Sequence, residues 1–312
     1  MWQRWFCYVV TLAVAFIAPP RAGAIIAHVS NLCSAISSNA TDVTLACTVT
    51  SNVSAGTSIL IGFTSGDTGS ETGISAGDSA GNPYTLDVVI TRTAGGPVRT
   101  AILAAHNVAA LTSGSSTVTV TFPSTSLCRA MAVHNYSSVA LTNALDQTAT
   151  GEGSSSAPAT SATSTRLQAD ELLFAAFGNT TASTFTQGTN FTSRTSVITA
   201  DCGTNRRIST EDQIVKVYGT DAGTGSYAAT EQWSGAIATY RDVNPNRYWL
   251  GSCASDNWTD TACWSATSGG ASGASAPNDA FVACNFDANS FAGTGETVNV
   301  NTTTAAHCGS LA

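Results

Sequence analysis

Hydrophobic and polar residues alternate along much of this chain. Between Thr117 and Phe122, valine and phenylalanine occupy every second position and threonine occupies the positions between them. A period of two places the apolar side chains on one face of a strand, and threonine suits the wet face. The same period of two runs through residues 43–50 and 84–90, and further strands are predicted at residues 58–63, 129–136, 171–177, 213–218 and 227–240, the last with a break near Gly235.

Clusters of Gly, Asn, Asp, Ser and Pro separate these segments, and no convincing amphipathic helix lies between them. Many short strands without helices predict an all-β fold, and we expect an antiparallel, jelly-roll-like sandwich over residues 25–243. Residues 98–111 fit a helix or a pair of strands equally well. The low-complexity run at residues 149–165 is interpreted as a long surface loop.

Residues 1–24 have the layout of a secretory signal peptide. Arg4 precedes an almost wholly apolar run at positions 6–18, and small residues at positions 22–24 fit an A-x-A cleavage site. The run is too short for a membrane-spanning helix, which needs roughly 20 apolar residues. We therefore assign residues 1–24 to the signal peptide, and expect a protein that is secreted or held at the cell surface, with no transmembrane segment.

Cysteine usage fits an oxidising compartment. The chain has nine cysteines, and loss of Cys7 with the signal leaves an even number, which permits complete pairing. A zinc site is the alternative, but it needs close pairs of ligands, and only His307 and Cys308 are adjacent. We therefore expect disulfides and no metal site. Sequence proximity favours Cys33–Cys47, Cys253–Cys263 and Cys284–Cys308, which leaves Cys128 for Cys202.

The mature chain is acidic and contains few charged residues. Removal of Arg4 and Arg21 with the signal changes the net charge from −8 to −10, and Lys216 is the only lysine. Nucleic acids and anionic membranes are bound through Lys and Arg, so neither is expected as a partner. Charged residues make up 10% of the chain, against about a quarter in typical domains. The surface is therefore expected to be rich in hydroxyl groups.

Three motifs in the predicted sandwich resemble a module that is repeated in secreted bacterial proteins. They are D-S-A-G-N-P-Y-T-L at residues 78–86, L-D-Q-T at residues 145–148, and G-S-Y-A-A-T at residues 225–230 with Trp233. The resemblance covers residues 25–243 and implies a β-sandwich. That family has no established activity, so the resemblance implies no reaction.

The first of these motifs also has a local explanation. Asp78 can close an Asx-turn, Gly81 and Asn82 tolerate positive φ, and Tyr84 begins an inward-facing set of side chains. We interpret the motif as a hairpin corner.

The tail, residues 244–312, has a different composition. Tyr248, Trp249, Trp258 and Trp264 lie close together in sequence, and three of the six tryptophans of the chain are among them. The order of its motifs resembles the opening of secreted right-handed β-helix proteins, in which such a segment caps the first coil. The motifs are R-Y-W-L-G (247–251), N-W-T-D (257–260), C-W-S (263–265), A-P-N-D (276–279) and F-D-A-N-S-F (286–291).

The tail departs from that family by adding Cys253, Cys263, Cys284 and Cys308. Residues 297–301 alternate as a first rung would, but stacked repeats need at least about three units for a continuous core. Either the chain is a fragment of a longer β-helix protein, or the disulfides substitute for further coils.

The aromatic residues of the tail allow two interpretations. Tyr248, Trp249, Trp258 and Trp264 can stack on sugar rings while Asp256, Asn257 and Asp260 bind hydroxyls, which makes the four aromatic residues candidate glycan-binding residues. In a small stapled unit, large aromatic side chains more often form the core.

The chain lacks the H-E-x-x-H, P-loop and dinucleotide-binding motifs. We assign no catalytic residue and no cofactor, and His134, inside a predicted strand, is interpreted as a structural histidine. A Ser/His/Asp triad stays open, because triads are recognised by geometry.

Two carboxylate pairs and one acidic loop were candidates for other chemistry. Asp170 with Glu171, and Glu211 with Asp212, are adjacent in sequence and are expected on opposite faces of strands, as solvated residues. Asp67, Glu71 and Asp78 lie in one Gly/Ser-rich region, but turn formation explains them better than a calcium site does.

Two function classes follow. The first is a noncatalytic extracellular protein of the cell surface, for adhesion or for binding of an extracellular polysaccharide or cell-surface glycan. The alternative is an enzyme, the N-terminal part of a β-helix polysaccharide lyase or hydrolase whose catalytic coils are missing from this chain.

Overall fold

A computed structural model describes residues 25–38, 42–66, 69–123, 128–181, 183–200, 202, 204–243, 246–251, 253–277, 279–290, 298–300 and 308–311. The predicted signal peptide, residues 1–24, lies outside the described residues. Within the described residues no helix is long and apolar enough to cross a membrane.

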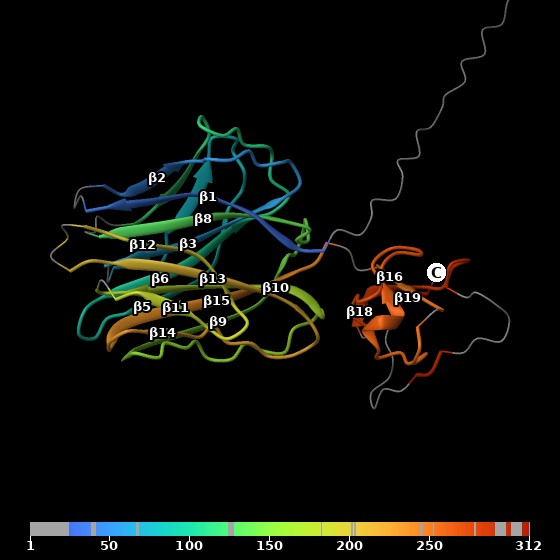
Figure 1. Ribbon diagram of the computed structural model, residues 1–312. Helices are drawn as coiled ribbons and strands as arrows, with labels where there is room; N and C mark the ends of the chain where they lie inside the picture. The colour runs from blue at the N-terminus through green and yellow to red at the C-terminus, as the bar shows by residue number, and fades with distance from the viewer. Residues whose placement is uncertain are drawn as a thin grey trace, which may run out of the picture.

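Two five-stranded antiparallel sheets form the centre of the molecule (Figure 1). The first sheet has the strand order β1-β8-β3-β6-β5 and the second has the order β12-β13-β10-β15-β9. The predicted all-β antiparallel sandwich is therefore confirmed. The strands of the first sheet are β1 (Ala27–Ser37), β3 (Ser58–Ser65), β5 (Thr85–Arg92), β6 (Val98–Ala105) and β8 (Arg129–Ser137); those of the second are β9 (Leu145–Ser155), β10 (Asp170–Asn179), β12 (Thr192–Ile198), β13 (Arg207–Lys216) and β15 (Glu231–Arg241).

Each central sheet also carries an outer layer. A three-stranded sheet, β2-β7-β4, packs on the first sheet through a core that includes Leu45, Val118 and Phe63. The second sheet is covered by the pair β11-β14 and by two extended segments, residues 156–166 and 219–227, that hydrogen-bond to each other. The outer strands are β2 (Thr44–Thr48), β4 (Ser75–Asp78), β7 (Thr117–Thr121), β11 (Phe185–Gln187) and β14 (Gly225–Tyr227).

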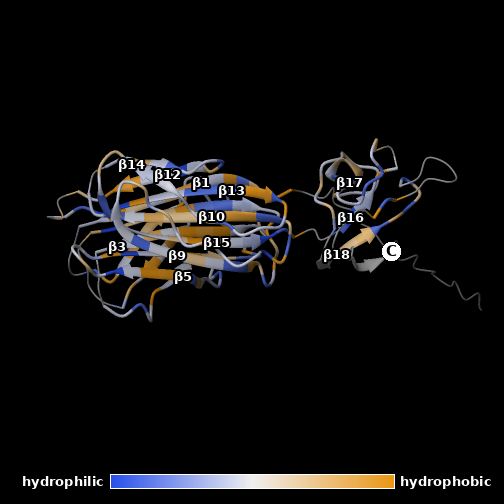
Figure 2. Ribbon diagram, turned by 90° about the horizontal axis from the view of Figure 1, so that it is seen from below, coloured by the Kyte–Doolittle hydropathy of each residue, from blue (hydrophilic) through white to orange (hydrophobic). Residues whose placement is uncertain are grey.

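The central strands are buried on both faces. Every residue of β3, β6 and β10 is buried, and Figure 2 shows apolar residues gathered in strands such as β10 and β15. Leu60 and Phe174 lie in the core between the two central sheets, whereas Ile61 and Phe177 lie in the cores under the outer layers. Burial on both faces explains why these strands read as continuous apolar runs and do not alternate.

Three details of the sequence interpretation are corrected or resolved. The ambiguous residues 98–111 contain strand β6. The expected break near Gly235 falls at residues 228–230. Gly235 itself is inside β15, and it is a glycine because a Cβ there would lie 2.5 Å from the ring of Phe177. Residues 149–155 belong to β9 and are not loop. Small residues are required there, since a Cβ on Gly151 would lie 2.3 Å from the carbonyl oxygen of Ala159 in the covering segment.

The tail forms a separate four-stranded sheet in the order β17-β16-β18-β19 (Figure 1, orange to red). Its pairs β16·β18 and β18·β19 are parallel, which brings Arg247, Cys284 and Leu311 into one register row. Strand β17 pairs antiparallel with the other edge of β16. The elements are β16 (Asn246–Trp249), the short 3-10 helix η1 (Thr261–Cys263), β17 (Trp264–Ser265), β18 (Asp279–Asn285) and β19 (Cys308–Leu311).

Two of the predicted disulfides are present. Cys33 is bonded to Cys47, which links β1 to β2, and Cys253 is bonded to Cys263 in the tail. Cys284 is also disulfide-bonded, and the side chain of its expected partner Cys308 lies outside the described residues.

The bridge expected between Cys128 and Cys202 is not formed. Both cysteines are buried and free. The prediction correctly brings them together, but the Cys128 thiol donates to the main-chain carbonyl of Cys202, with 3.4 Å between sulfur and oxygen. The two thiol side chains also interact with each other, so the cysteines are neighbours that stay unbridged in this structure.

Candidate functional site

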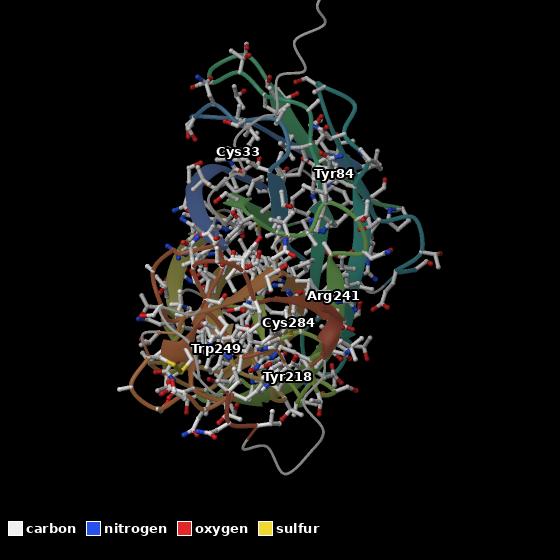
Figure 3. All side chains as sticks on the ribbon, turned by 90° about the vertical axis from the view of Figure 1, so that its right-hand side faces the viewer. Cys33, Tyr84, Tyr218, Arg241, Trp249 and Cys284 are labelled. Carbon is white, nitrogen blue, oxygen red and sulfur yellow. A yellow bond between two sulfur atoms is a disulfide. The ribbon has the colours of Figure 1, made fainter. Side chains whose placement is uncertain are left out.

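The tryptophans predicted as glycan-binding residues form the core of the tail. Trp249, Trp258 and Trp264 are 1%, 6% and 0% exposed, and Figure 3, viewed from the tail side, shows Trp249 and Cys284 within its packed side chains. The rings of Trp249 and Trp258 meet that of Trp264 edge to face, with centroids 5.1 and 4.9 Å apart. Tyr248 is only half-buried.

Hydrogen bonds fix two of these indoles as well. Trp258 donates from Nε1 to the carbonyl of Pro277, and Trp264 donates to the carbonyl of Trp258, each at 2.8 Å. The core-packing interpretation therefore describes the three tryptophans, and their covered faces leave no platform for a sugar ring in this structure.

The acidic residues once considered for calcium have protein partners. Asp78 accepts from the Ala80 amide at 3.0 Å, as the predicted Asx-turn requires, and its other oxygen accepts from the Tyr84 hydroxyl at 3.1 Å. Glu71 accepts from the Thr91 hydroxyl at 2.5 Å, and Asp67 lies outside the described residues. Within the described part of the chain no group of three or more His, Cys, Asp or Glu side chains could hold a metal ion.

A groove of about 440 Å³ lies where β1, β2 and β12 meet. We call it the edge groove, because β1 and β12 are edge strands of the two central sheets. Among the described residues that line it, the hydrogen-bonding side chains are one amide and four hydroxyls, and none is charged. The groove is lined by Asn31, Cys33, Ser34, Ala46, Cys47, Thr48, Thr50 and Thr195.

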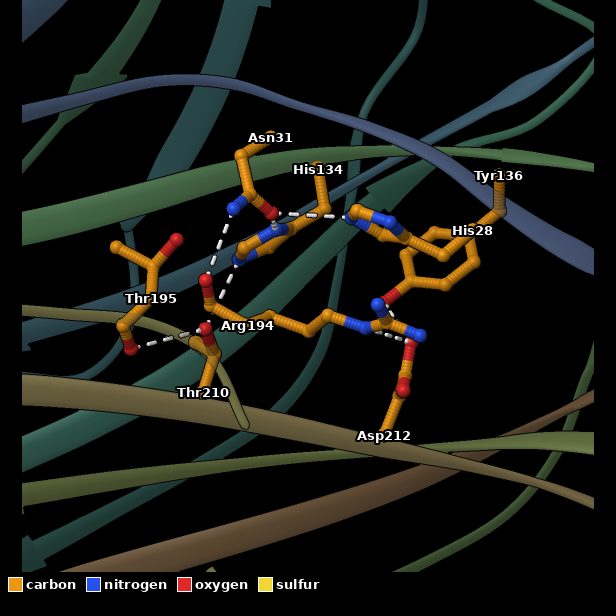
Figure 4. Close-up of polar contacts among 8 residues, drawn as sticks. All are labelled: His28, Asn31, His134, Tyr136, Arg194, Thr195, Thr210 and Asp212. Carbon is orange, nitrogen blue, oxygen red and sulfur yellow. Dashed lines mark hydrogen bonds and ion pairs between the residues drawn. The ribbon is translucent and has the colours of Figure 1, made fainter. Parts of the chain in front are cut away.

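A hydrogen-bonded network runs inward from this groove (Figure 4). Asn31 Oδ1 accepts from His28 Nε2 at 3.0 Å and from His134 Nδ1 at 2.8 Å. The other ring nitrogen of His134 lies 2.9 Å from the hydroxyl of Thr210. We call these four residues the histidine network; it crosses from β1 and β8 in the first sheet to β13 in the second.

Both histidines of the network are neutral at pH 7. Burial lowers the pKa of His134 to about 3, and electrostatic interactions with His28 and Arg194 act in the same direction. The pKa of His28 is lowered by burial and then by Arg194. Since a neutral His134 donates from Nδ1, its Nε2 accepts from Thr210. No lone pair of His134 is left for a substrate, which agrees with its interpretation as a structural histidine.

The network also fixes how Asn31 faces the groove. Its Oδ1 is used by the two histidines, and its Nδ2 donates to the carbonyl of Arg194 at 2.9 Å. An amide nitrogen has two hydrogens. The second hydrogen is the group that Asn31 presents to a ligand, and it selects a hydrogen-bond acceptor.

A second contact joins the two sheets beside the network. Asp212 Oδ2 accepts from the Tyr136 hydroxyl at 2.7 Å and from Arg194 Nε at 2.8 Å. The expectation that Glu211 and Asp212 face opposite sides of the strand is met, because Asp212 points to the first sheet while Glu211 accepts from Gly188 in the covering layer. The expectation that they are solvated is wrong, since both are buried.

The pair Asp170 and Glu171 is corrected in the same way, because both side chains are buried. Asp170 accepts from Arg247 and from Ser275 of the tail. Lys216, the only lysine, donates to the carbonyl of Gly273 at 3.1 Å. Around these contacts lies a cleft of about 190 Å³, the junction cleft, between sandwich and tail; its lining also includes Asp242, Ser265, Thr267 and Ser272.

Sequence reasoning missed the edge groove and its network. His28 and Asn31 stand close together on β1, and nothing in their spacing indicates a contact with His134, which is far from both in sequence. The available signal was weak: a histidine at an otherwise apolar strand position marks a buried polar group that must find a partner.

Comparison with protein-family models, with curated proteins and with solved structures gives no match.

Proposed function

We propose that this protein is a noncatalytic extracellular module that binds a neutral glycan in the edge groove, for adhesion or display at a cell surface. The groove is the observation that carries the proposal. Its volume of about 440 Å³ lies within the roughly 300–1,000 Å³ range of ligand sites. Its polar groups are hydroxyls and one amide, which match the hydroxyl groups of a sugar.

The absence of charge on the groove lining supports an uncharged ligand. Asn31, Ser34, Thr48 and Thr195 offer hydrogen bonds without a net field. The chain as a whole carries a net charge of −8 and would repel a polyanionic polymer. A neutral polysaccharide is not repelled by this net charge and needs no charged partner in the groove.

The histidine network supports a binding role over a catalytic one. Both ring nitrogens of His134 are engaged, and Asp212 is held by Tyr136 and Arg194. A general base requires a free lone pair within reach of the proton it removes. His134 instead holds Asn31 in place, and Asp212 holds the two sheets together.

The compartment is part of the proposal. The disulfides Cys33–Cys47 and Cys253–Cys263 are typical of proteins in oxidising environments. They agree with export, which the signal-like segment at positions 1–24 predicts.

Binding of neutral oligosaccharides to the mature chain, first on a glycan array and then by calorimetry, tests the proposal. The double variant Ser34→Ala/Thr48→Val removes two groove hydroxyls, and we expect it to weaken binding about thirtyfold, at about 1 kcal/mol for each hydrogen bond. Thr44→Val is the matched control, because Thr44 is another exposed threonine on β2 and does not line the groove. Absence of glycan binding, or equal affinities for the three proteins, would refute the proposal.

One observation favours the second candidate, the N-terminal part of a β-helix polysaccharide lyase or hydrolase whose catalytic coils are missing from this chain. Strands β16, β18 and β19 form a parallel ladder with β17 across one edge, and parallel stacking is how coils of a β-helix associate. Because the catalytic coils of this candidate lie outside the chain, its test is the coding sequence after Ala312: an in-frame continuation with further rungs would support this candidate over the first.

A further inference from the structure

Two carboxyl groups meet where the second sheet ends next to the tail. Asp146 lies at the start of β9, and Glu171 lies at the start of β10, opposite Arg241 in the ladder of β10 and β15. The side chains of Asp146 and Glu171 are both 0% exposed. They face each other and interact directly. We call them the carboxyl pair.

The two members of the carboxyl pair have different surroundings. Asp146 accepts from Arg241 Nη2 at 2.8 Å and from the Leu167 amide at 2.6 Å. Neither oxygen of Glu171 receives a donor at hydrogen-bonding geometry among the described residues, although the Thr239 hydroxyl faces it. Asp146 is thus solvated by the protein as an anion, and Glu171 is not.

The charges around Glu171 balance without it. Arg241 of β15 is paired with Asp146 of β9 at 2.8 Å, and Arg166 of the covering segment is paired with Asp221 at 2.6 Å. Each guanidinium therefore has its own carboxylate. An ionised Glu171 would add a buried negative charge that has no cation of its own among the described residues, and the attraction of Arg166 is smaller than the effects of burial and of Asp146.

We infer that Glu171 carries a proton at neutral pH and donates it to Asp146, so that one shared proton locks the start of edge strand β9 against β10. A hydrogen bond between two carboxyl groups exists only while one of them is protonated. The lock also reaches the covering layer, because the Leu167 amide is bound to the same aspartate.

Titration follows from this arrangement. Burial first, and then Asp146, raise the pKa of Glu171 to about 9, while the pKa of Asp146 is lowered by Glu171, the Leu167 amide and Arg241 against the effect of burial. The folded state thus binds a proton that the unfolded chain releases above its ordinary pKa of 4.5. Stability from this site is complete below that value and is lost as the pH rises through about 9.

The test compares the pH dependence of unfolding for the wild type and Glu171→Gln. A glutamine amide keeps a donor toward Asp146 and cannot ionise. We expect the unfolding equilibrium constant of the wild type, relative to that of Glu171→Gln, to rise by up to about tenfold per pH unit between pH 5 and 9. Glu152→Gln is the matched control, because Glu152 is exposed on the same strand β9; its profile should follow the wild type.

Equal pH profiles for wild type and Glu171→Gln would overturn the inference. A second measurement does not depend on the variant folding: carboxyl carbon NMR of the wild type labelled at its six glutamates. We expect one carboxyl resonance to titrate near pH 9, next to that of Glu211, whose pKa burial raises to about 8. If Glu211 is the only glutamate that titrates above pH 7, Glu171 is ionised at neutral pH and the lock does not exist. Glycan binding enters neither measurement.

Discussion

The hydroxyl of Tyr136 donates to Oδ2 of Asp212 at 2.7 Å, across the interface of the two central sheets. Tyr136 lies on β8 of the first sheet and Asp212 on β13 of the second, and both are buried. A buried carboxylate needs hydrogen-bond donors. The second donor described for Asp212 Oδ2 is Arg194 Nε, at 2.8 Å.

Replacement of Tyr136 by phenylalanine removes that donor without creating a large cavity. We expect a loss of about 1.5–3 kcal/mol in the free energy of unfolding, the usual contribution of a hydrogen bond to a charged group. Urea denaturation followed by circular dichroism measures it. Tyr248→Phe, on a half-buried tyrosine of the tail, is the control and should change stability by less than about 0.5 kcal/mol.

His134→Gln should reduce the sensitivity of the fold to acid. The pKa of His134 is about 3 in the folded state and 6.5 in the unfolded chain. Between pH 3 and 6.5 the unfolded chain therefore binds more protons than the folded protein. Stability therefore falls as the pH drops from 6.5 toward 3. Thermal melting across that range should show a shallower decline for His134→Gln than for the wild type. Parallel curves would mean that His134 does not contribute.

The two free cysteines give a chemical prediction. Cys128 and Cys202 are buried, and burial raises the pKa of the Cys128 thiol to about 12. An alkylating reagent should therefore leave both unmodified in the native protein and modify both after denaturation without reductant. Peptide mass spectrometry reads the result. A Cys128–Cys202 crosslinked peptide would instead establish the bridge that the sequence predicts.

Trp258→Ala tests the tail. The side chain is 6% exposed and its indole nitrogen donates to Pro277, so we expect the tail to lose about 3–5 kcal/mol of stability, as for other buried aromatic residues. Hydrogen exchange should show deprotection within residues 246–290 and an unchanged sandwich. An intact tail combined with weaker glycan binding would favour the sugar platform.

The sequence predicted the strands best where one face of a strand is polar. In β7, Val118 and Val120 alternate with threonine, and the predicted strand extends just past the observed one, to Phe122. In β9 the small residues were misread as a loop, because Gly151 is needed for close contact with Ala159 and not for flexibility. Close packing between segments distant in sequence leaves the same composition as a flexible loop.

The edge groove and the carboxyl pair illustrate a different limit. Asp146 and Arg241 are 95 residues apart, and Asn31 and Arg194 are 163 residues apart. Alternation tells which face of a strand a residue occupies, but it does not fix which strands become neighbours or in what register. For that reason the burial of Asp170, Glu171, Glu211 and Asp212 was not foreseen, although their opposed directions were.

Every residue of strands β3 and β10 is buried. Every substitution in these two strands therefore changes the packing of the core, and neither strand has an exposed position that tolerates sequence variation. Room for new chemistry, whether an inserted epitope, a fluorophore or the drift of an evolving surface, exists in the turns and in the outermost layers. The stacked arrangement thus separates the part of the chain that must stay constant from the part that can diversify.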